Sequence, residues 1–410
     1  MTIVALEALT FGLGKMVSAA EHFGVKLTLL TRDTSVYAYE LANIDSDTLE
    51  IIELDTFDKP LVIDTLKAMP DVQGLLSTTD TWSLDCLDIA QACGLDSQDP
   101  ESIRLVRNKF RLRNRLHELG LSAGKSIEVT PATADSREVC RGLEYPVIIK
   151  DTAGTGSQNV WMAHNDEDTC RVLAQARQAA LKGKIAIEPF ISGTLYSVET
   201  LSWKGENRVL AVTSRVVSEE PEFREEALAS PVNLGEPKTQ ALSLWIDKVL
   251  SGVGYTNGFA HTEFFITETG FEVVEINPRL GGVQIGEALC RVYDYNLYEA
   301  FIEMALGRRP ALMDRPLVAQ KGVGQIIVYA RQAGHFERVT GLERLAGHPG
   351  QPMFYPTAER GKAITSLTDQ RASVGILVAE GENSEIALLN AFAARSKLTV
   401  VVQAGGSNDA

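Results

Sequence analysis

The sequence contains few cysteines, and their placement excludes two common uses of this residue. Cys86, Cys93, Cys140, Cys170 and Cys290 form an odd, scattered set without a Cys-x-x-Cys pair. They therefore predict neither a disulfide framework nor a zinc site. A reducing cytoplasm is the compartment that fits them best.

Long apolar runs and basic residues are also scarce. No stretch reaches the roughly 18 apolar residues of a membrane-spanning helix, and the first fifteen residues do not have the pattern of a signal peptide. Lys and Arg number 39 against 54 Asp and Glu, which gives a net charge of −15. Because nucleic acids and anionic membranes bind basic surfaces, we expect neither as a partner.

What is present is the composition of an ordinary globular protein, with 45% hydrophobic and 23% charged residues in a chain of 410. This length exceeds one hydrophobic core, so several domains are predicted. Strand-like and helical patterns alternate at the start of the chain, at 2–6, 14–23, 25–31, 72–76 and 82–93. The alternation predicts an open α/β domain with a parallel sheet over residues 1–97.

The first predicted strand is followed by the turn Gly12-Leu13-Gly14-Lys15. It is not a P-loop, because the first glycine of that motif is missing and Met16 replaces Ser or Thr. It also fails the dinucleotide fingerprint, since Val17 occupies the third glycine position, and this weakens a dehydrogenase interpretation. We interpret it as a tight strand-to-helix turn; the alternative is a site for a substrate anion at the helix N-terminus.

The rest of the chain predicts further helices and strands. A helix is expected over 100–122, ending at Gly120, and others near 166–181, 237–251 and 284–306. The final part, with strands at 324–330, 373–379 and 398–402 and a helix at 383–395, predicts a separate small α+β domain.

The most informative stretch lies around Gly270, where two β-rich runs predict a hairpin. Side chains alternate along a strand, so Glu275, Asn277 and Arg279 point the same way, and Glu263 can oppose Glu275 across the hairpin. Two carboxylates and an amide suit Mg²⁺, which prefers oxygen ligands, water and nucleotide phosphates. A solvated face with a surface ion pair is the structural alternative.

A predicted strand ending on Lys150 leads into the loop Gly154-Thr155-Gly156-Ser157. Glycine allows backbone N–H groups to approach and surround phosphates, so this loop predicts a flexible phosphate-covering flap. An ordinary hairpin turn is the alternative. Lys109, on the helix upstream, is a second basic candidate, although a helical lysine is usually solvated.

The stretch from Glu188 to Ile191 predicts a strand that runs into an irregular segment. Pro189 lacks an amide N–H, which leaves backbone groups near Phe190 and Ile191 free to bind an adenine edge. Glu188 could then accept a hydrogen bond from the exocyclic amine. A strand end with a proline turn is the alternative.

In order and spacing, these features resemble the ATP-grasp superfamily. The resemblance implies an N-terminal pre-grasp α/β domain (1–97), two α+β lobes that clasp ATP (126–190 and 191–318, within a domain at 98–318) and a small C-terminal α+β subdomain (319–410). It implies that ATP is bound by Lys109, Lys150, Gly154, Thr155, Gly156, Ser157, Glu188, Pro189, Phe190, Ile191 and Glu199. It implies Mg²⁺, or Mn²⁺ as a substitute, on Glu263, Glu275 and Asn277, with Arg279 as the catalytic arginine.

Within the superfamily, the chain most resembles carboxylate–amine ligases that join amino acids, of the bacilysin, dapdiamide and siderophore-amide types. The resemblance is carried by His261-Thr262-Glu263-Phe264, by Asn277 to Gly282, by Pro221 to Glu225 and by Ser230-Pro231. It implies that ATP phosphorylates a carboxylic acid, and that an amine or amino acid then attacks the acyl phosphate to give an amide.

The same resemblance implies contacts with substrate. Glu225 would bind a substrate ammonium, His261 would orient a substrate or the metal shell, and Gly281 and Gly282 would lie beside the substrate. A solvated carboxylate and a structural histidine are the alternatives for the first two.

Two other functions stay open at this point. The first is an ATP-grasp carboxylase acting through carboxyphosphate, because the block at 375–379 also resembles the carboxylase tail. The second is a non-catalytic ATP-binding protein. The sequence does not identify the acid, the amine or the pathway; a homodimer is expected only because ATP-grasp ligases are often dimers.

Overall fold

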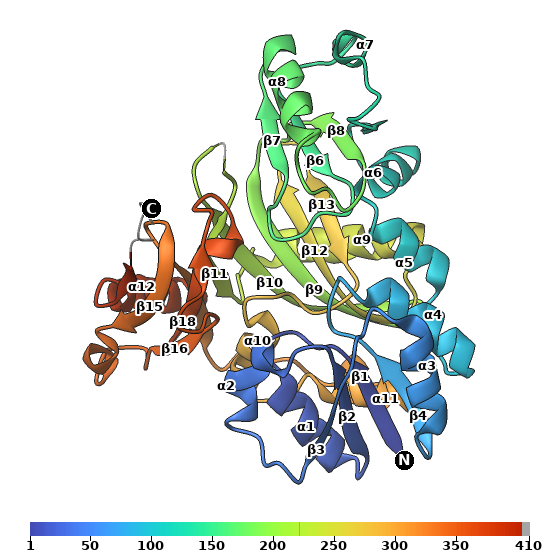
Figure 1. Cartoon of the computed structure of the whole chain (residues 1–410), viewed down its shortest axis with the longest axis vertical. Coiled ribbons are helices and arrows are strands. Elements are labelled where there is room, and N and C mark those ends of the chain that lie inside the picture. The colour runs from blue at the N-terminus through green and yellow to red at the C-terminus, as the bar shows by residue number, and fades with distance from the viewer. Residues whose placement is uncertain (221, 404–410) are drawn as a thin grey trace, which may run out of the picture.

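The computed structural model describes residues 1–220 and 222–403. Pro221 and residues 404–410 lie outside the described residues. The sequence from Gly405 to Ala410 predicts a loose tail. Figure 1 shows the N-terminal domain at the bottom in blue, a small lobe at the top in green, and a long sheet that extends to the orange and red C-terminal segment.

The N-terminal domain is the parallel α/β unit that the sequence predicts. Its strand order is β3-β2-β1-β4, and β1 is buried along its whole length. The strands are β1 (Thr2–Leu6), β2 (Lys26–Thr31), β3 (Leu49–Glu53) and β4 (Val72–Leu76). The helices are α1 (Leu13–His22), α2 (Ala38–Leu41), α3 (Lys59–Ala68) and α4 (Ser83–Cys93).

The turn between β1 and α1 is closed by protein groups. Gly12 precedes the helix with φ +98°, and Gly14 N–H donates to Glu40 Oε2 at 2.8 Å. A carboxylate of the chain therefore occupies the helix N-terminus, where an anion is favoured. The interpretation as a tight structural turn is confirmed.

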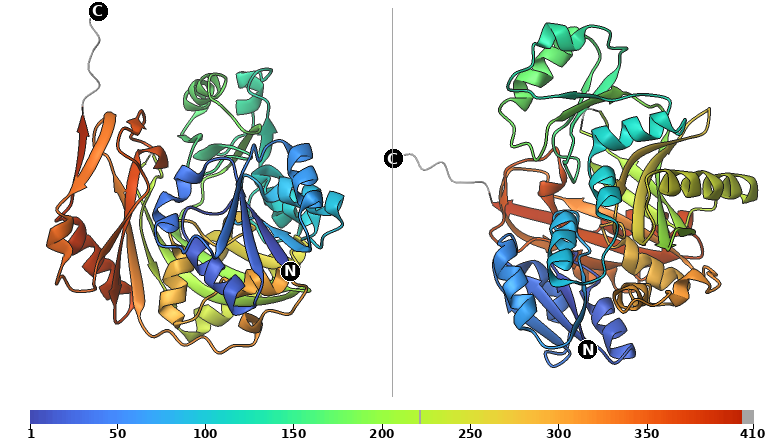
Figure 2. Two further views of the ribbon diagram at one scale, coloured as in Figure 1. Left: turned by 60° about the horizontal axis from the view of Figure 1, so that its bottom comes forward. Right: turned by 90° about the vertical axis from the view of Figure 1, so that its right-hand side faces the viewer.

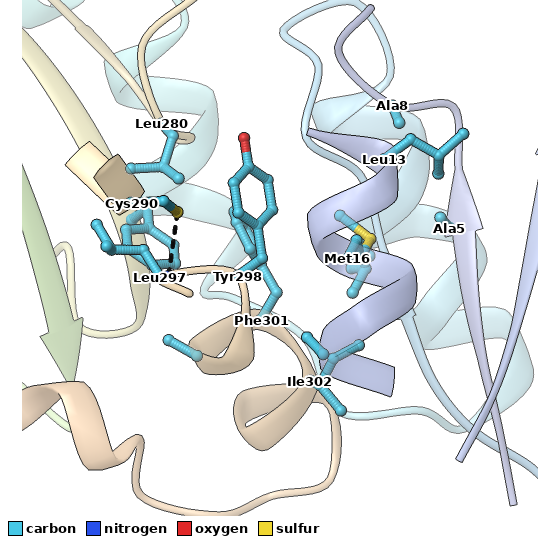
Figure 3. Close-up of a cluster of buried hydrophobic side chains, with 14 of the residues drawn as sticks. Ala5, Ala8, Leu13, Met16, Leu280, Cys290, Leu297, Tyr298, Phe301 and Ile302 are labelled. Atoms are coloured by element: carbon cyan, nitrogen blue, oxygen red, sulfur yellow. Dashed lines mark hydrogen bonds between the residues drawn. The ribbon is translucent and has the colours of Figure 1, made fainter. Parts of the chain in front are cut away.

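A shared hydrophobic core joins this domain to the segment after the predicted hairpin (Figure 3). Side chains from β1 and α1 face those from the region around α11 (Glu299–Ala305), and Leu297 N–H donates to Cys290 Sγ at 3.3 Å. The labelled members are Ala5, Ala8, Leu13, Met16, Leu280, Cys290, Leu297, Tyr298, Phe301 and Ile302. The core holds the carboxyl ends of the N-terminal strands against the hairpin.

The small lobe is a four-stranded antiparallel sheet of order β5-β8-β6-β7, packed on two helices. Its strands are β5 (Ile127–Val129), β6 (Val147–Asp151), β7 (Val160–Ala163) and β8 (Ile185–Pro189). Its helices are α7 (Ser136–Cys140) and α8 (Asp166–Ala176). The expected helix at 166–181 is therefore one turn shorter than predicted.

The large sheet has eight antiparallel strands in the order β13-β12-β9-β10-β11-β14-β18-β16. Figure 2 shows its green strands beside the orange and red strands of the C-terminal segment. They are β9 (Thr194–Trp203), β10 (Glu206–Val217), β11 (Glu225–Ser230), β12 (Gly258–Ile266), β13 (Phe271–Asn277), β14 (Gly322–Tyr329), β16 (Met353–Pro356) and β18 (Ser373–Gly381). Helices α9 (Glu236–Gly252), α10 (Ile285–Tyr293) and α11 (Glu299–Ala305) belong to the same region.

The C-terminal segment is not a separate sheet, as the sequence led us to expect. Strand β14 pairs with β11 of the large lobe, and β18 and β16 extend that sheet further. Only β15 (Gly334–Thr340), β17 (Ala363–Ile364) and β19 (Thr399–Gln403) form a small sheet of their own, beside α12 (Ser384–Arg395). The pairing across positions 230 and 323 is a long-range contact that local patterns cannot show; the domain boundaries themselves stay a prediction.

Two predicted helices are each split in two. The helix at 100–122 is α5 (Pro100–Val106) and α6 (Lys109–Glu118), because Asn108 caps α6 by accepting from Arg111 N–H at 2.9 Å. The helix at 284–306 breaks after α10, where Asp294 takes a left-handed conformation. Among residues 1–220 and 222–403, no helix has the length and apolar character that crossing a membrane requires.

Candidate active site

A cavity of about 560 Å³ lies between the small lobe and the large sheet. It collects side chains from α6, the small lobe, the hairpin and the C-terminal segment. Of all the predicted site residues, only Glu199 and Gly281 do not line it. Residues more than 160 positions apart in the sequence thus meet in one space.

The predicted hairpin is confirmed as β12 and β13, and its register brings the metal-ligand candidates together. Glu263 lies directly opposite Glu275, and His261 opposite Asn277. Asn277 Nδ2 donates to Glu275 Oε1 at 2.9 Å. The alternative of a solvated face is wrong, since Glu263 and Glu275 lie in the cavity and Asn277 is 4% exposed.

Basic side chains surround these three oxygen ligands. Lys109 Nζ lies 2.9 Å from Glu275 Oε2, and the Arg107 guanidinium donates to Asn277 Oδ1 at 3.3 Å. Burial would raise the pKa of Glu275, but the Lys109 ammonium and the bond from Asn277 hold that pKa well below its usual range. The carboxylate is therefore ionised, as a metal ligand must be.

The donor set fits Mg²⁺ better than a metal caged by protein alone. Within the part of the chain that the structure describes, no group of three or more His, Cys, Asp or Glu side chains is arranged to hold a metal. Two carboxylates and an amide leave positions for water and substrate phosphates, which is the usual coordination of Mg²⁺ beside a nucleotide.

Lys150, at the end of β6, is buried in a charged cluster. Its ammonium forms an ion pair with Glu188, and Arg113 Nε lies 3.3 Å from the second Glu188 oxygen. Burial lowers the pKa of Lys150, while Lys150 and Arg113 hold the pKa of Glu188 below its usual value despite its burial. Both oxygens of Glu188 are thus engaged by basic side chains, and Glu188 orients Lys150. Glu188 also lines the cavity, and its expected hydrogen bond to an adenine amine stays a prediction.

The glycine loop between β6 and β7 closes over the cavity. Lys109 Nζ donates to the Gly154 carbonyl at 2.6 Å, and Ser157 Oγ donates to the Phe223 carbonyl at 3.1 Å. Gly156 and Ser157 both have positive φ, of 64° and 56°. The residues of this loop line the cavity, and the loop extends from Lys109 to Phe223 on the opposite side.

The segment after β8 is only partly free to bind a base. Phe190 N–H donates to the Pro146 carbonyl at 3.0 Å, so this amide is not available, contrary to the expectation. Pro189, Phe190 and Ile191 still line the cavity. The remaining backbone groups for an adenine edge are the Ile191 N–H and the nearby carbonyls.

Arg279 is oriented by a residue that the sequence analysis missed. Its Nε donates to Asp80 Oδ2 at 2.7 Å, its Nη2 contacts the same oxygen, and its Nη1 donates to the Leu280 carbonyl at 2.8 Å. Asp80 also pairs with Arg107 at 3.2 Å. Asp80 follows β4 at the carboxyl edge of the parallel sheet, and that position was the available signal.

Comparison with known proteins supports the same family. The ATP-grasp domain family matches residues 143–287, and the L-amino acid ligase C-terminal domain 2 family matches residues 326–403. Residues 143–287 therefore form an ATP-grasp domain.

Relatives of this ATP-grasp protein include human carnosine synthase 1, with 24% identity over 73% of this chain and 39% of that protein. The L-arginine-specific L-amino acid ligase of Bacillus subtilis is 21% identical over 71% of each chain. The crystal structure of an L-amino acid ligase from Bacillus licheniformis has a TM-score of 0.82 at 20% identity, covering 98% of this chain and 99% of that one. The predicted ATP-grasp fold is confirmed.

Arg215 on β10 links the substrate candidates to the metal candidates. It pairs with Glu225, contacts Glu263 Oε1 at 3.0 Å and lies 3.0 Å from His261 Nε2. Glu225 is 4% exposed, so the alternative of a solvated carboxylate is wrong, and burial raises its pKa against the opposing charge of Arg215. The sequence signal for Arg215 was a charge on a strand that also carries the apolar residues Val212 and Val216.

Glu199 supports the site from behind. It is fully buried, pairs with His261 Nδ1 and accepts from Gly281 N–H at 3.0 Å, so the prediction that it contacts ATP is wrong. Burial alone would lower the pKa of His261, but the Glu199 carboxylate raises it to about 9. A Cβ on Gly281 would lie 2.8 Å from His261 Nδ1, so this glycine allows the close approach, while Gly282 lines the cavity.

Proposed function

We propose that this ATP-grasp protein is an ATP- and Mg²⁺-dependent carboxylate–amine ligase, which forms an amide and releases ADP and phosphate. One observation carries the proposal. Lys109, Lys150, the glycine loop, the hairpin ligands and Arg279 all line a single cavity. The similarity to amino acid ligases and carnosine synthase favours an amide product over other ATP-grasp chemistry.

Lys109 and Lys150 bind and orient the phosphates of ATP, and the backbone of the glycine loop covers them. Bound Mg²⁺ on Glu263, Glu275 and Asn277 would neutralise charge on the transferred phosphoryl group. With those charges balanced, a substrate carboxylate oxygen attacks the γ-phosphorus, and ADP leaves. The product is an acyl phosphate held beside Arg279.

Arg279 stabilises the oxyanion that forms when an amine attacks the acyl phosphate. The guanidinium has five N–H donors, and its three bonds to Asp80 and Leu280 leave two for the oxyanion. Because Asp80 already fixes its orientation, Arg279 needs little rearrangement during the reaction. Phosphate then leaves and the amide remains.

Finer features belong to the same proposal. Amino acids are proposed as substrates, with a dipeptide-like product of natural-product or siderophore type. Five free cysteines support a cytoplasmic location. The family resemblance also supports substitution of Mn²⁺ for Mg²⁺, which metal exchange in the activity assay tests. It supports a homodimeric assembly, which light scattering tests.

The test is phosphate release from ATP across amino acids, small acids and small amines, singly and in pairs, with mass detection of the products. We expect ADP formation that requires both an acid and an amine. Bicarbonate-dependent release without an amine would support the carboxylase instead, and ATP binding without turnover would support a non-catalytic protein.

Two variants test the assigned roles in the same assay. We expect Arg279→Ala to bind ATP nearly as well as the wild type while amide formation falls by ~10²–10³-fold. Glu275→Gln should raise the Mg²⁺ concentration needed for half-maximal rate. Loss of ATP affinity in the first variant, or an unchanged metal titration in the second, would refute the corresponding role.

A further inference from the structure

A second cavity, of about 250 Å³, adjoins the first. Its wall is formed by three parts of the chain: the loop after β1 (Leu9 to Phe11), the segment Gly281 to Gln284, and the C-terminal segment. Gly282, Val283 and Gln370 line both cavities. The two cavities therefore meet at these three residues.

The wall between the cavities has a strained backbone. Val283 and Gln284 both adopt left-handed conformations, with φ of 55° and 62°, and such a conformation is rare for a β-branched residue. Strain of this kind persists where the surroundings impose it, often at ligand sites. Gln284 is 4% exposed, and its side-chain Nε2 has no hydrogen-bond partner among the described residues. A buried donor without a partner is costly, so a ligand acceptor would stabilise it.

Lys362 is the basic side chain of this cavity. It is half-buried, its Nζ donates to the Ser373 carbonyl at 2.8 Å, and no carboxylate of the described residues lies within ion-pair distance. Lys362 does not line the first cavity. A partly desolvated ammonium without a carboxylate partner favours an anion beside it.

The other ionisable group of the cavity opposes an anion only weakly. Burial raises the pKa of Glu287 to about 7, and Tyr298 Oη donates to its carboxyl. Glu287 is therefore partly neutral at physiological pH. The cavity thus combines one ammonium, one amide donor and a weakened negative charge.

We propose that the second cavity binds a substrate carboxylate that is not activated during the reaction. The Lys362 ammonium pairs with this carboxylate and the Gln284 amide donates to it. This inference rests on the proposed ligase function. The carboxylate that is phosphorylated must lie in the first cavity with Arg279 and the metal ligands, so the one on Lys362 stays free in the product.

Two sources carry such a group: the α-carboxylate of an amino acid acceptor, and the second carboxylate of a dicarboxylic donor. The test compares wild type with Lys362→Met and Lys362→Arg. The probes are L-amino acids against their amides as acceptors, and succinate against propanoate as donors. Thermal shift measures binding, and ADP release measures turnover.

For the probe whose carboxylate is recognised, we expect Lys362→Met to raise KM roughly ten-fold, with kcat and the KM for ATP almost unchanged. Lys362→Arg keeps the charge and should retain most of the affinity. The amide or monocarboxylic analogue should bind the wild type as weakly as the acid binds Lys362→Met. A rise in KM for amino acids in Lys362→Met identifies the acceptor as the source of the bound carboxylate. A rise in KM for succinate identifies the donor as the source.

Lys321→Met is the matched control, because this lysine lies on the same segment, outside both cavities, and pairs with Glu380 at 2.7 Å. It should leave every KM unchanged. The inference is overturned if Lys362→Met alters no KM or thermal shift by more than two-fold, or if no carboxylate probe stabilises the wild type. Absence of turnover with every pair would refute the ligase function alone, since the thermal shift still reports on the cavity.

Discussion

Two glycine-containing turns of this chain each follow a strand and precede a helix or another strand. Of these two, one lines the large cavity and the other does not. At Gly12 and Gly14, the Glu40 carboxylate accepts the Gly14 N–H, and Tyr298 lies against Gly12. At Gly154 and Gly156, the loop lines the large cavity. The comparison teaches that glycine spacing alone does not make an anion site; what decides is whether the protein has already filled the position.

The largest difference between the two turns should appear when the lysine beside each one is removed. Lys150→Met removes a buried ammonium at the end of β6, beside the glycine loop, so we expect kcat/KM for ATP to fall by ~10²–10³-fold. Lys15→Met removes an exposed lysine beside the closed turn and should change kcat/KM for ATP less than two-fold. Steady-state kinetics and calorimetric ATP binding measure both. Similar losses in the two variants would break the comparison.

Alanine at each glycine should separate stability from nucleotide binding. In Gly12→Ala, a Cβ would lie 2.1 Å from Tyr298 Oη at φ +98°, so we expect a loss of roughly 2–4 kcal/mol in the free energy of unfolding with unchanged ATP affinity. In Gly156→Ala, the nearest atom is Gln370 Oε1 at 3.2 Å, at the end of a flexible side chain.

For Gly156→Ala we therefore expect little loss of stability. A left-handed alanine costs about 1 kcal/mol; the loop of the free variant relaxes to avoid this cost and must meet it on binding, so ATP should bind about five-fold more weakly. Urea unfolding and ATP titration of both variants check this crossed pattern. An ATP defect in Gly12→Ala would show that the closed turn takes part in nucleotide binding.

The smallest effect concerns the carboxylate that closes the first turn. Burial raises the pKa of Glu40 above its ordinary value of 4.5. Its folded form therefore prefers the proton, so its contribution to stability is fully present below the unfolded pKa and is lost as pH rises through the folded pKa. Glu40→Gln removes this titration, and its unfolding free energy should decline less than that of wild type as pH rises from about 4. Urea unfolding measures the unfolding free energy of both proteins across this pH range. Equal changes in wild type and Glu40→Gln would contradict the burial of this charge.

The local parts of the fold and site were predictable because their signals are local. Alternation and a glycine turn identified the hairpin, and a spacing of twelve residues placed Glu263 opposite Glu275. Contacts between distant segments were not predictable in this way. Asp80 and Arg279 are 199 positions apart, and no pattern near either one identifies its partner.

Buried charges explain the wrong assignments. Glu199 occupies the expected place along the chain, but its carboxylate is fully buried and engaged by His261 rather than exposed to a ligand, and Glu188 pairs with Lys150 at the cavity wall. A sequence shows that a charge lies on a strand, whereas the three-dimensional packing decides what neutralises it. The break at Asn108 was missed for a different reason: the helical pattern continues through a residue that also caps helices.

The pairing of β11 with β14 has a consequence for protein engineering. A chimera that exchanges the C-terminal segment by cutting the chain near residue 319 would leave β11 as an unprotected sheet edge, which is prone to aggregation. The same cut would remove Gln370 from the walls of both cavities. A graft that retains β14 and β18 from the host and replaces only the loops between them respects this continuity.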